Sequence, residues 1–337
     1  MRNLSITRAC FGLLSLAAAI TSGLVPATGQ EPYPSRHVRI ITTAGTGTSP
    51  DVVVRIIAEQ LSRDWGQQVV VENNGTGGGL VAAQQAAAAA PDGYTLLLAS
   101  ASAFTVLPIR HEHAPTVVGR DLKPIAFLGE LPMAYAVSAK LGVRSVKELI
   151  ELSKREPEKI FYAANATGTL PHMAGEHFKS RAGASLTFVP YRGTADALAG
   201  VLSGQINAIV ENYVTLAGTI QSGDLVLLAF SSKDRLPNFP DVPTVGETLP
   251  GFVAIGWAAL CAPAGVSDAI VQKINADVRR IFDKPDVRQR LIDLGNYPAS
   301  MSTTELARFI RQEQEQWSPV VRSILAQAAA AQSRDKR

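Results

Sequence analysis

The residues best suited to chemistry in this sequence are uncharged hydrogen-bond donors in short, glycine-containing loops. The first loop covers residues 43–51 and reads Thr-Ala-Gly-Thr-Gly-Thr-Ser-Pro-Asp, with no Lys or Arg. A helix is expected to open within it, with Ser49 as the N-cap, Pro50 in the first turn and Asp51 behind it. Backbone N–H groups, hydroxyls and the positive end of a helix dipole can hold a small anion without a cation. The loop is therefore a candidate carboxylate site, although most turns of this kind bind nothing.

Three more loops of small and polar residues follow along the chain. They read Asn-Gly-Thr-Gly-Gly-Gly, Ala-Ser-Ala-Ser-Ala and Asn-Ala-Thr-Gly-Thr, at residues 74–79, 99–103 and 165–169. Each follows an apolar run typical of a buried strand, and helical patterns separate these runs. Alternating strands and helices build parallel sheets, which bind ligands beyond the carboxyl ends of their strands. The sequence therefore predicts an α/β fold in which these loops line one cleft.

Nucleotide and hydrolase motifs are missing from the sequence. The run from Gly75 to Leu80 approaches the dinucleotide pattern G-x-G-x-x-G but ends in Leu, and the run that starts at Gly45 ends in Pro50. Neither a G-x-x-x-x-G-K-[ST] loop nor a G-x-S-x-G elbow occurs. We therefore expect no catalytic residue and no cofactor, with a dinucleotide enzyme and a hydrolase as the alternatives.

Histidine clusters are the candidates for metal binding. The His-Glu-His run at 111–113 falls in an irregular polar segment that is better interpreted as solvated surface. His172 with Glu176 or His177 lacks the H-E-x-x-H spacing, so no metal site is expected. His172 stands in the first turn of a helix that faces the cleft, where it either contacts a ligand or caps the helix. Arg192 is the most plausible cation near the cleft, with a surface role as the alternative.

The N-terminus has the pattern of a secretory signal peptide. Arg2 and Arg8 precede an uncharged run at 9–20, and small residues allow cleavage after Ala27, or alternatively after Gly29. The formal net charge of +3 falls to +1 without those two arginines, and no basic run suggests nucleic-acid binding. Cleavage would leave Cys261 as the single cysteine, in an apolar run where we expect it to be buried. These features predict a soluble exported protein without an intrachain disulfide.

The remaining pattern predicts two α/β lobes with chain crossings near residues 130 and 256. The signal covers residues 1–27, the first lobe 28–130 plus 256–337, and the second lobe 131–255. Residues 125–128 and 134–138 are expected as separate strands. A closing helix at 303–327 carries an apolar stripe at helical spacing, which we expect to pack onto the first lobe.

Over residues 33–325 the chain resembles the periplasmic substrate-binding receptors of tripartite tricarboxylate transporters, also called Bug receptors. Individually short motifs carry the resemblance through their order and spacing. They are Tyr-Pro-Ser-Arg at 33–36, Val-Glu-Asn at 71–73, Ala-Pro-Asp-Gly-Tyr-Thr-Leu-Leu at 90–97, Ser-Val-Lys-Glu-Leu at 145–149, His-Met-Ala-Gly-Glu-His-Phe-Lys at 172–179, Val-Pro-Tyr-Arg-Gly at 189–193, Leu-Ser-Gly-Gln at 202–205, Pro-Asp-Val-Pro-Thr-Val at 240–245 and Ala-Pro-Ala-Gly at 262–265.

The resemblance implies a type II periplasmic binding protein fold, with a ligand cleft between its two lobes. It also implies that backbone groups and water hold a ligand carboxylate between two loops, here residues 43–51 and 165–172. Two features depart from the family pattern. Thr48 stands where the family usually has the second glycine of a pair, and the segment after Leu107 is shorter and less regular.

We therefore predict a monomeric periplasmic receptor that captures a small organic carboxylate and delivers it to the subunits of a membrane permease. Ligand would favour a closed form reached by hinge motion about the two crossings. A receptor that signals to a sensor kinase, or an exported hydrolase, is the alternative.

The predicted ligand contacts come from both lobes. Asp51 is expected to support the helix start or to select an amine or hydroxyl. The other predicted contacts are the carboxylate donors Thr43, Gly47, Thr48 and Ser49, then Ser102 of the first lobe, Thr167, Gly168, Thr169 and His172 of the second, and the wall residues Asn212 and Trp257.

Overall fold

The sheet begins with three parallel strands, as the alternating pattern predicted. The central strand β1 (Val38–Thr42) pairs with β2 (Val69–Asn73) on one side and β3 (Thr95–Ser100) on the other. Helices α1 (Ser49–Trp65) and α2 (Leu80–Ala87) make the crossovers between them. The computed structural model describes residues 32–110 and 120–335, without the side chains of residues 77–78 and 328–335. The expected signal peptide and residues 111–113 lie outside the described residues.

The strand β4 (Leu122–Ser138) joins two groups of strands. Its first part pairs antiparallel with β9 (Ile255–Pro263), and its second part, from Met133 on, pairs with β7 (Ala208–Asn212) and β8 (Leu225–Phe230). The expectation of separate strands at 125–128 and 134–138 is therefore wrong. Two register shifts in the pairing of β4 with β9 skip Ile125 and Leu128. Gly129, which follows the second shift, has φ +121° and lies so close to Asn296 that a Cβ would overlap it.

The second group of strands is again parallel at its far end. Strand β5 (Ile160–Ala163) pairs with β7 and with β6 (Leu186–Phe188). The hydrogen-bonded order among the described strands is β2-β1-β3-β9-β4-β7-β5-β6, with β8 also on β4. The helices that accompany this group are α5 (Val146–Arg155), α6 (Leu170–Ala182), α7 (Thr194–Leu202) and α8 (Tyr213–Gln221). The mixed α/β fold predicted from the sequence is confirmed.

Shorter helices and the C-terminal helices complete the chain. Within the described residues, every helix is too short or too polar to span a bilayer. The elements are η1 (Thr76–Gly79), α3 (Ala101–Thr105), α4 (Leu107–Arg110), η2 (Ala139–Leu141), α9 (Val245–Thr248), α10 (Asp268–Phe282), α11 (Pro285–Asp293) and α12 (Thr303–Asp335).

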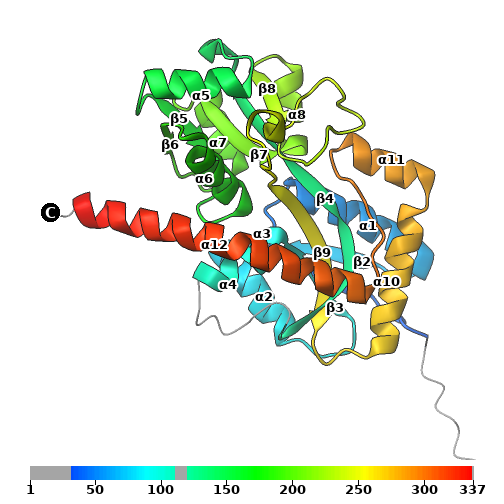
Figure 1. The fold of residues 1–337 in the computed structure, drawn as a ribbon. Coiled ribbons are helices and arrows are strands. Elements are labelled where there is room, and N and C mark those ends of the chain that lie inside the picture. Colours follow the sequence, from blue (N-terminus) through cyan, green and yellow to red (C-terminus); the bar gives the residue numbers. More distant parts are fainter. Residues whose placement is uncertain (1–31, 111–119, 336–337) are drawn as a thin grey trace, which may run out of the picture. The chain divides into compact units, whose positions relative to one another are not determined.

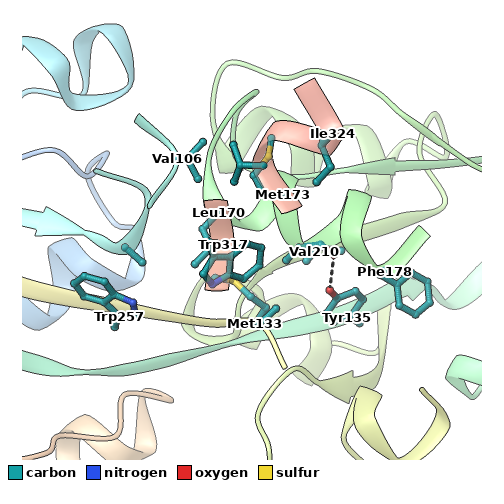
Figure 2. Close-up of a cluster of buried hydrophobic side chains, with 14 of the residues drawn as sticks. Val106, Met133, Tyr135, Leu170, Met173, Phe178, Val210, Trp257, Trp317 and Ile324 are labelled. Atoms are coloured by element: carbon teal, nitrogen blue, oxygen red, sulfur yellow. Dashed lines mark hydrogen bonds between the residues drawn. The ribbon is translucent and has the colours of Figure 1, made fainter. Parts of the chain in front are cut away.

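Helix α12 contacts elements from both groups of strands. It packs against α3, α4 and β4, and also against α6 (Figure 1). Figure 2 shows Trp317 and Ile324 of α12 in one buried cluster with Leu170 and Met173 of α6. The apolar stripe is core, as expected, but it packs against α6, which accompanies the second group of strands, as well as against elements of the first group. The spacing of a stripe identifies the buried face of a helix and not the partners of that face.

Candidate functional site

A cavity of about 760 Å³ lies at the carboxyl ends of strands and the starts of helices. All four loops singled out in the sequence reach it, through residues 43–48, Gly75, 100–102 and 165–166 with 169–171. The structure adds further wall segments, in which the sequence analysis had singled out only Asn212, Trp257 and Arg192. These further lining residues are Leu131, Met133, Arg192, Gly193, Thr194, Ala195, Leu198, Asn212, Val214, Thr215, Gly256 and Trp257.

The first loop is held in shape by its own hydrogen bonds. The N-cap of α1 is Thr48, one residue earlier than expected, and its hydroxyl donates to the Gly45 carbonyl at 2.7 Å. The Gly47 amide, in a left-handed conformation at φ +77°, donates to Asp51 Oδ2 at 2.9 Å. Asp51 is buried and does not line the cavity, because its carboxylate turns back toward the loop. Asp51 therefore organises the loop from behind.

The ionised form of Asp51 is favoured by its neighbours. Burial alone would raise the pKa of Asp51, but hydrogen bonds from Arg55, Gly47 and Asn73 outweigh it and hold the pKa below its ordinary value. The Asn73 amide comes from the end of β2, at 2.7 Å from Asp51 Oδ1. The carboxylate thus ties the loop after β1 to the neighbouring strand.

The second glycine loop supports the first by close approach. Gly79 has φ +95°, and a Cβ there would lie 2.6 Å from the Thr43 Cβ. Any residue with a Cβ would therefore have to displace Thr43, and only glycine fits this space. Gly75 alone of this loop lines the cavity, so most of the glycine run packs behind the first loop.

The loop before α6 is closed by side chains in the same manner. Thr169, the N-cap residue, donates from its hydroxyl to Asn165 Oδ1 at 2.6 Å and to the Ala166 carbonyl at 2.8 Å. The Gly168 amide donates to His172 Nδ1 at 3.1 Å. Burial lowers the pKa of His172 to about 4, so its neutral ring is the acceptor at neutral pH. The ring packs on Phe188, and His172 does not line the cavity.

Two contacts join the first group of strands to the loop before α6. Ser102 Oγ of α3 accepts from the Leu170 amide at 2.9 Å, and Arg110 Nη1 of α4 donates to the Thr167 carbonyl at 3.1 Å. The Arg110 guanidinium also covers Gly168, where a Cβ would overlap it. Ser102 thus lines the cavity and at the same time holds the first turn of α6.

The two expected wall residues are each fixed by a hydrogen bond, buried for Asn212 and partly buried for Trp257. Asn212 Nδ2 donates to the Leu131 carbonyl at 2.9 Å, which joins β7 to β4. Trp257 Nε1 donates to Glu313 Oε2 of α12 at 2.9 Å, and its ring lies 5.0 Å from that of Phe104. Burial raises the pKa of Glu313 despite this bond. The cavity wall at Trp257 is therefore set by the C-terminal helix.

The predicted contacts thus divide into two sets. Residues that line the cavity are Thr43, Gly47, Thr48, Ser102, Thr169, Asn212 and Trp257. Residues that do not line it are Ser49, Asp51, Thr167, Gly168 and His172, of which Thr167 is exposed. Whether either set contacts a ligand stays a prediction.

Glu211 is a residue near the cavity that the sequence analysis missed. It is buried on β7, and its carboxyl accepts from the Asn212 amide at 2.8 Å and from the Thr194 hydroxyl at 3.3 Å. Burial raises the pKa of Glu211 to about 7, against the lowering effect of these two donors. The sequence feature that could have identified Glu211 is an acidic residue between Val210 and Asn212, at the end of an otherwise apolar run.

The chemistry of the lining is that of binding through uncharged donors. Among the described residues that line the cavity, Arg192 is the one charged side chain. Helices α1, α6, α7 and α8 each contribute residues from their first turn or N-cap region to the lining, which places the positive ends of four helix dipoles there. In the part of the chain that the structure describes, no three His, Cys, Asp or Glu side chains are grouped to hold a metal ion.

Comparison with known proteins agrees with the resemblance stated above. Residues 53–325 match the model of the tripartite tricarboxylate transporter family receptor. The protein BugT of Bordetella pertussis is 33% identical over 308 residues, which are 90% of this chain and 93% of BugT.

Solved structures give the same result. An R. palustris protein solved with adipate has a TM-score of 0.82 and 26% identity, over 86% of this chain and 97% of that one. MatC from Rhodopseudomonas palustris, solved with bound malate, has a TM-score of 0.78 and 28% identity, over 86% of this chain and all (100%) of MatC. The fold, the order of the motifs and the match over most of the chain agree, and the chain belongs to the receptor family of the tripartite tricarboxylate transporters.

Proposed function

We propose that this chain is an exported solute receptor that captures a small organic carboxylate and passes it unchanged to a membrane permease. One observation carries the proposal: uncharged donor loops and helix N-termini surround a single cavity whose lining includes no described acid. The adipate and malate in the two related structures are carboxylates of the kind that such a lining would hold.

Recognition of the carboxylate would depend on the loops before α1 and α6. The hydroxyls of Thr48 and Thr169 now donate to oxygens of their own loops and would turn toward an incoming anion. The dipoles of α1 and α6 would add to the attraction, at about 0.3–1 kcal/mol for each helix terminus. Backbone donors recognise a carboxylate and leave the rest of the ligand to the wall residues.

Ligand capture would be coupled to a hinge in β4 and β9. Residues 28–130 with 256–337 would form one lobe and residues 131–255 the other. The change of pairing partner of β4 at Met133 supports a hinge there. The Ser102–Leu170 hydrogen bond crosses between these lobes beside the cavity and would stabilise the closed form. Such a receptor would act as a monomer in the periplasm after removal of residues 1–27.

A thermal-shift screen of the mature protein against mono- and dicarboxylates tests the proposal. A ligand that binds only the folded protein raises its melting temperature by mass action. We expect at least one acid to raise it, the corresponding neutral amide to have no effect, and the acid to be recovered unchanged. Chemical turnover would favour the hydrolase alternative, and absence of any shift across the panel would contradict the receptor. Co-purification of a loaded receptor with a sensor kinase, and not with a permease, would favour the signalling alternative.

A further inference from the structure

Helix α12 is fixed to the first group of strands along its first half. Its Glu313 carboxyl accepts a hydrogen bond from Trp257 Nε1 of β9 at 2.9 Å. The next residue, Gln314, donates from Nε2 to the Phe104 carbonyl of α3 at 3.1 Å. One turn before Glu313, the centre of the Phe309 ring lies 5.2 Å from that of Trp257. These contacts hold this half of the helix against β9 and α3.

Further along, α12 contacts α6, which accompanies the second group of strands. Trp317 and Ile324 of α12 lie in one buried cluster with Met173 of α6 (Figure 2). The centre of the Trp317 ring also lies 6.2 Å from that of His177 of α6. Met173 and His177 are four residues apart, so they share one face of α6. The same helix therefore contacts both groups of strands, with different parts of its length.

The contact between α12 and α6 is separate from the ligand cavity. None of its four side chains lines the cavity. The contact is largely apolar and buried, with Met173 0% and Ile324 8% exposed. Burial of apolar surface stabilises whichever arrangement of two elements buries more of it, and it requires no ligand. The contact therefore stabilises this arrangement in the empty protein as well as in the loaded one.

We propose that the contact of Trp317 and Ile324 with Met173 and His177 is a clasp that holds the empty receptor partly closed. The inference rests on the proposed function, in which a hinge in β4 and β9 joins two lobes. Helix α12 is fixed to the first lobe, and α6 belongs to the second, so opening would separate the two helices and expose their apolar faces. The clasp thus positions the donor loop before α6 without touching the ligand.

The clasp has a quantitative consequence for affinity. When a ligand is held only by the closed form, its apparent dissociation constant is the intrinsic constant divided by the fraction of empty protein that is closed. Any change in the clasp should therefore change that fraction and the apparent dissociation constant by the same factor. A residue that only stabilises the fold would lower the melting temperature without this coupling.

Spin-label distances in the empty protein test the clasp. Thr76 of η1 and Asp196 of α7 are exposed, and each lies next to a lining residue on its own side of the cavity. Cysteine at both positions accepts labels, whereas Cys261 is buried, and opening should lengthen the distance between the labels. Pulsed electron spin resonance then gives the fractions of closed and open molecules.

The same labelled pair is measured in the mature protein and in three variants, Ile324→Ala, Ile324→Val and Leu306→Ala. Leu306 is the matched control, because it is buried in α12 about 27 Å along the helix from Ile324. A melting curve of each variant checks that it is folded. Calorimetric titration with adipate and with malate, the acids in the two related structures, gives the apparent dissociation constants.

We expect Ile324→Ala to lower the closed fraction at least about threefold and to raise the apparent dissociation constant by the same factor. Ile324→Val should act in the same direction by less, and Leu306→Ala should leave both quantities unchanged although it lowers the melting temperature. A closed fraction that Ile324→Ala does not change, an equal loss in Leu306→Ala, or an affinity that does not follow the closed fraction would overturn the clasp while the proposed function stands. A parent with one label distance that neither acid changes would overturn the hinge and the clasp together.

Discussion

Replacement of Glu211 by Gln should change how the stability of the protein depends on pH. Glu211 is buried beside the cavity, and burial raises the pKa of its carboxyl from 4.5 to about 7. An acid whose pKa is raised on folding keeps its proton in the folded chain after it has lost it in the unfolded chain. The unfolded state then binds fewer protons, so the free energy of unfolding falls as pH rises from about 4.5 to 7.

The size of this effect follows from the pKa difference. Each pKa unit corresponds to about 1.4 kcal/mol, so the parent protein should lose about 3 kcal/mol of stability through Glu211 over that interval. Gln keeps the shape of the side chain and an oxygen that accepts from the Asn212 amide, but it does not titrate. The stability of Glu211→Gln relative to the parent should therefore rise across the interval and level off above it.

Urea unfolding of both proteins between pH 4.5 and 8 measures this difference. Glu151→Gln is the matched control, because it makes the same chemical change at an exposed position of α5. Its unfolding free energy should follow that of the parent at every pH. If the curves for Glu211→Gln and the parent run parallel over the whole range, the carboxyl of Glu211 does not carry its proton into the folded state.

Four further substitutions test the loops and the wall. Thr48→Pro and Gly168→Val should each weaken carboxylate binding more than about tenfold. The first substitution removes the hydroxyl and the amide N–H of a loop residue, and the second adds a side chain at a backbone position with left-handed φ. If calorimetry finds the same affinity for both variants as for the parent, the loops do not form the binding site. Asp51→Asn should lower the unfolding free energy by about 1–3 kcal/mol, since it weakens charge-assisted bonds from the loop amide and its neighbours, and an unchanged urea midpoint would contradict this. Trp257→Phe should cost a similar amount, because the half-buried Glu313 carboxyl loses the indole donor of Trp257 although it keeps that of Trp317. The loss raises the pKa of Glu313 further, so the deficit in the free energy of unfolding should shrink as the pH falls, and urea unfolding at several pH values that finds a deficit independent of pH would contradict this.

The parallel strands and the position of the loops could be predicted because they follow from local pattern. Apolar runs that alternate with helical patterns predict a parallel sheet. In a parallel sheet the loops that follow the strands all lie at the edge formed by the carboxyl ends of the strands. The residues of the loops at 43–48, Gly75, 100–102 and 165–166 with 169–171 accordingly line one cavity. The continuity of β4 could not be predicted, because Gly129 looks like a strand breaker unless its packing against Asn296 is known.

The sequence pattern did not predict whether a side chain of these loops points into the cavity or away from it. Asp51 and His172 lie in the first turns of helices that begin at the cavity. Each side chain nevertheless points back and accepts a hydrogen bond from a backbone amide of its own loop. Glu211 is buried by strands and helices far apart in the chain, and no local pattern measures that burial. The Ser102–Leu170 bond joins residues 68 positions apart and depends on the packing of the two groups of strands.

A crystal structure of the mature protein grown with a saturating dicarboxylate would show whether the donor loops hold a carboxylate. We expect density for the acid in the cavity, with one carboxylate about 2.7–3.2 Å from donors of the loops before α1 and α6. A cavity that stays empty at saturation, or an acid bound at another place on the molecule, would contradict it.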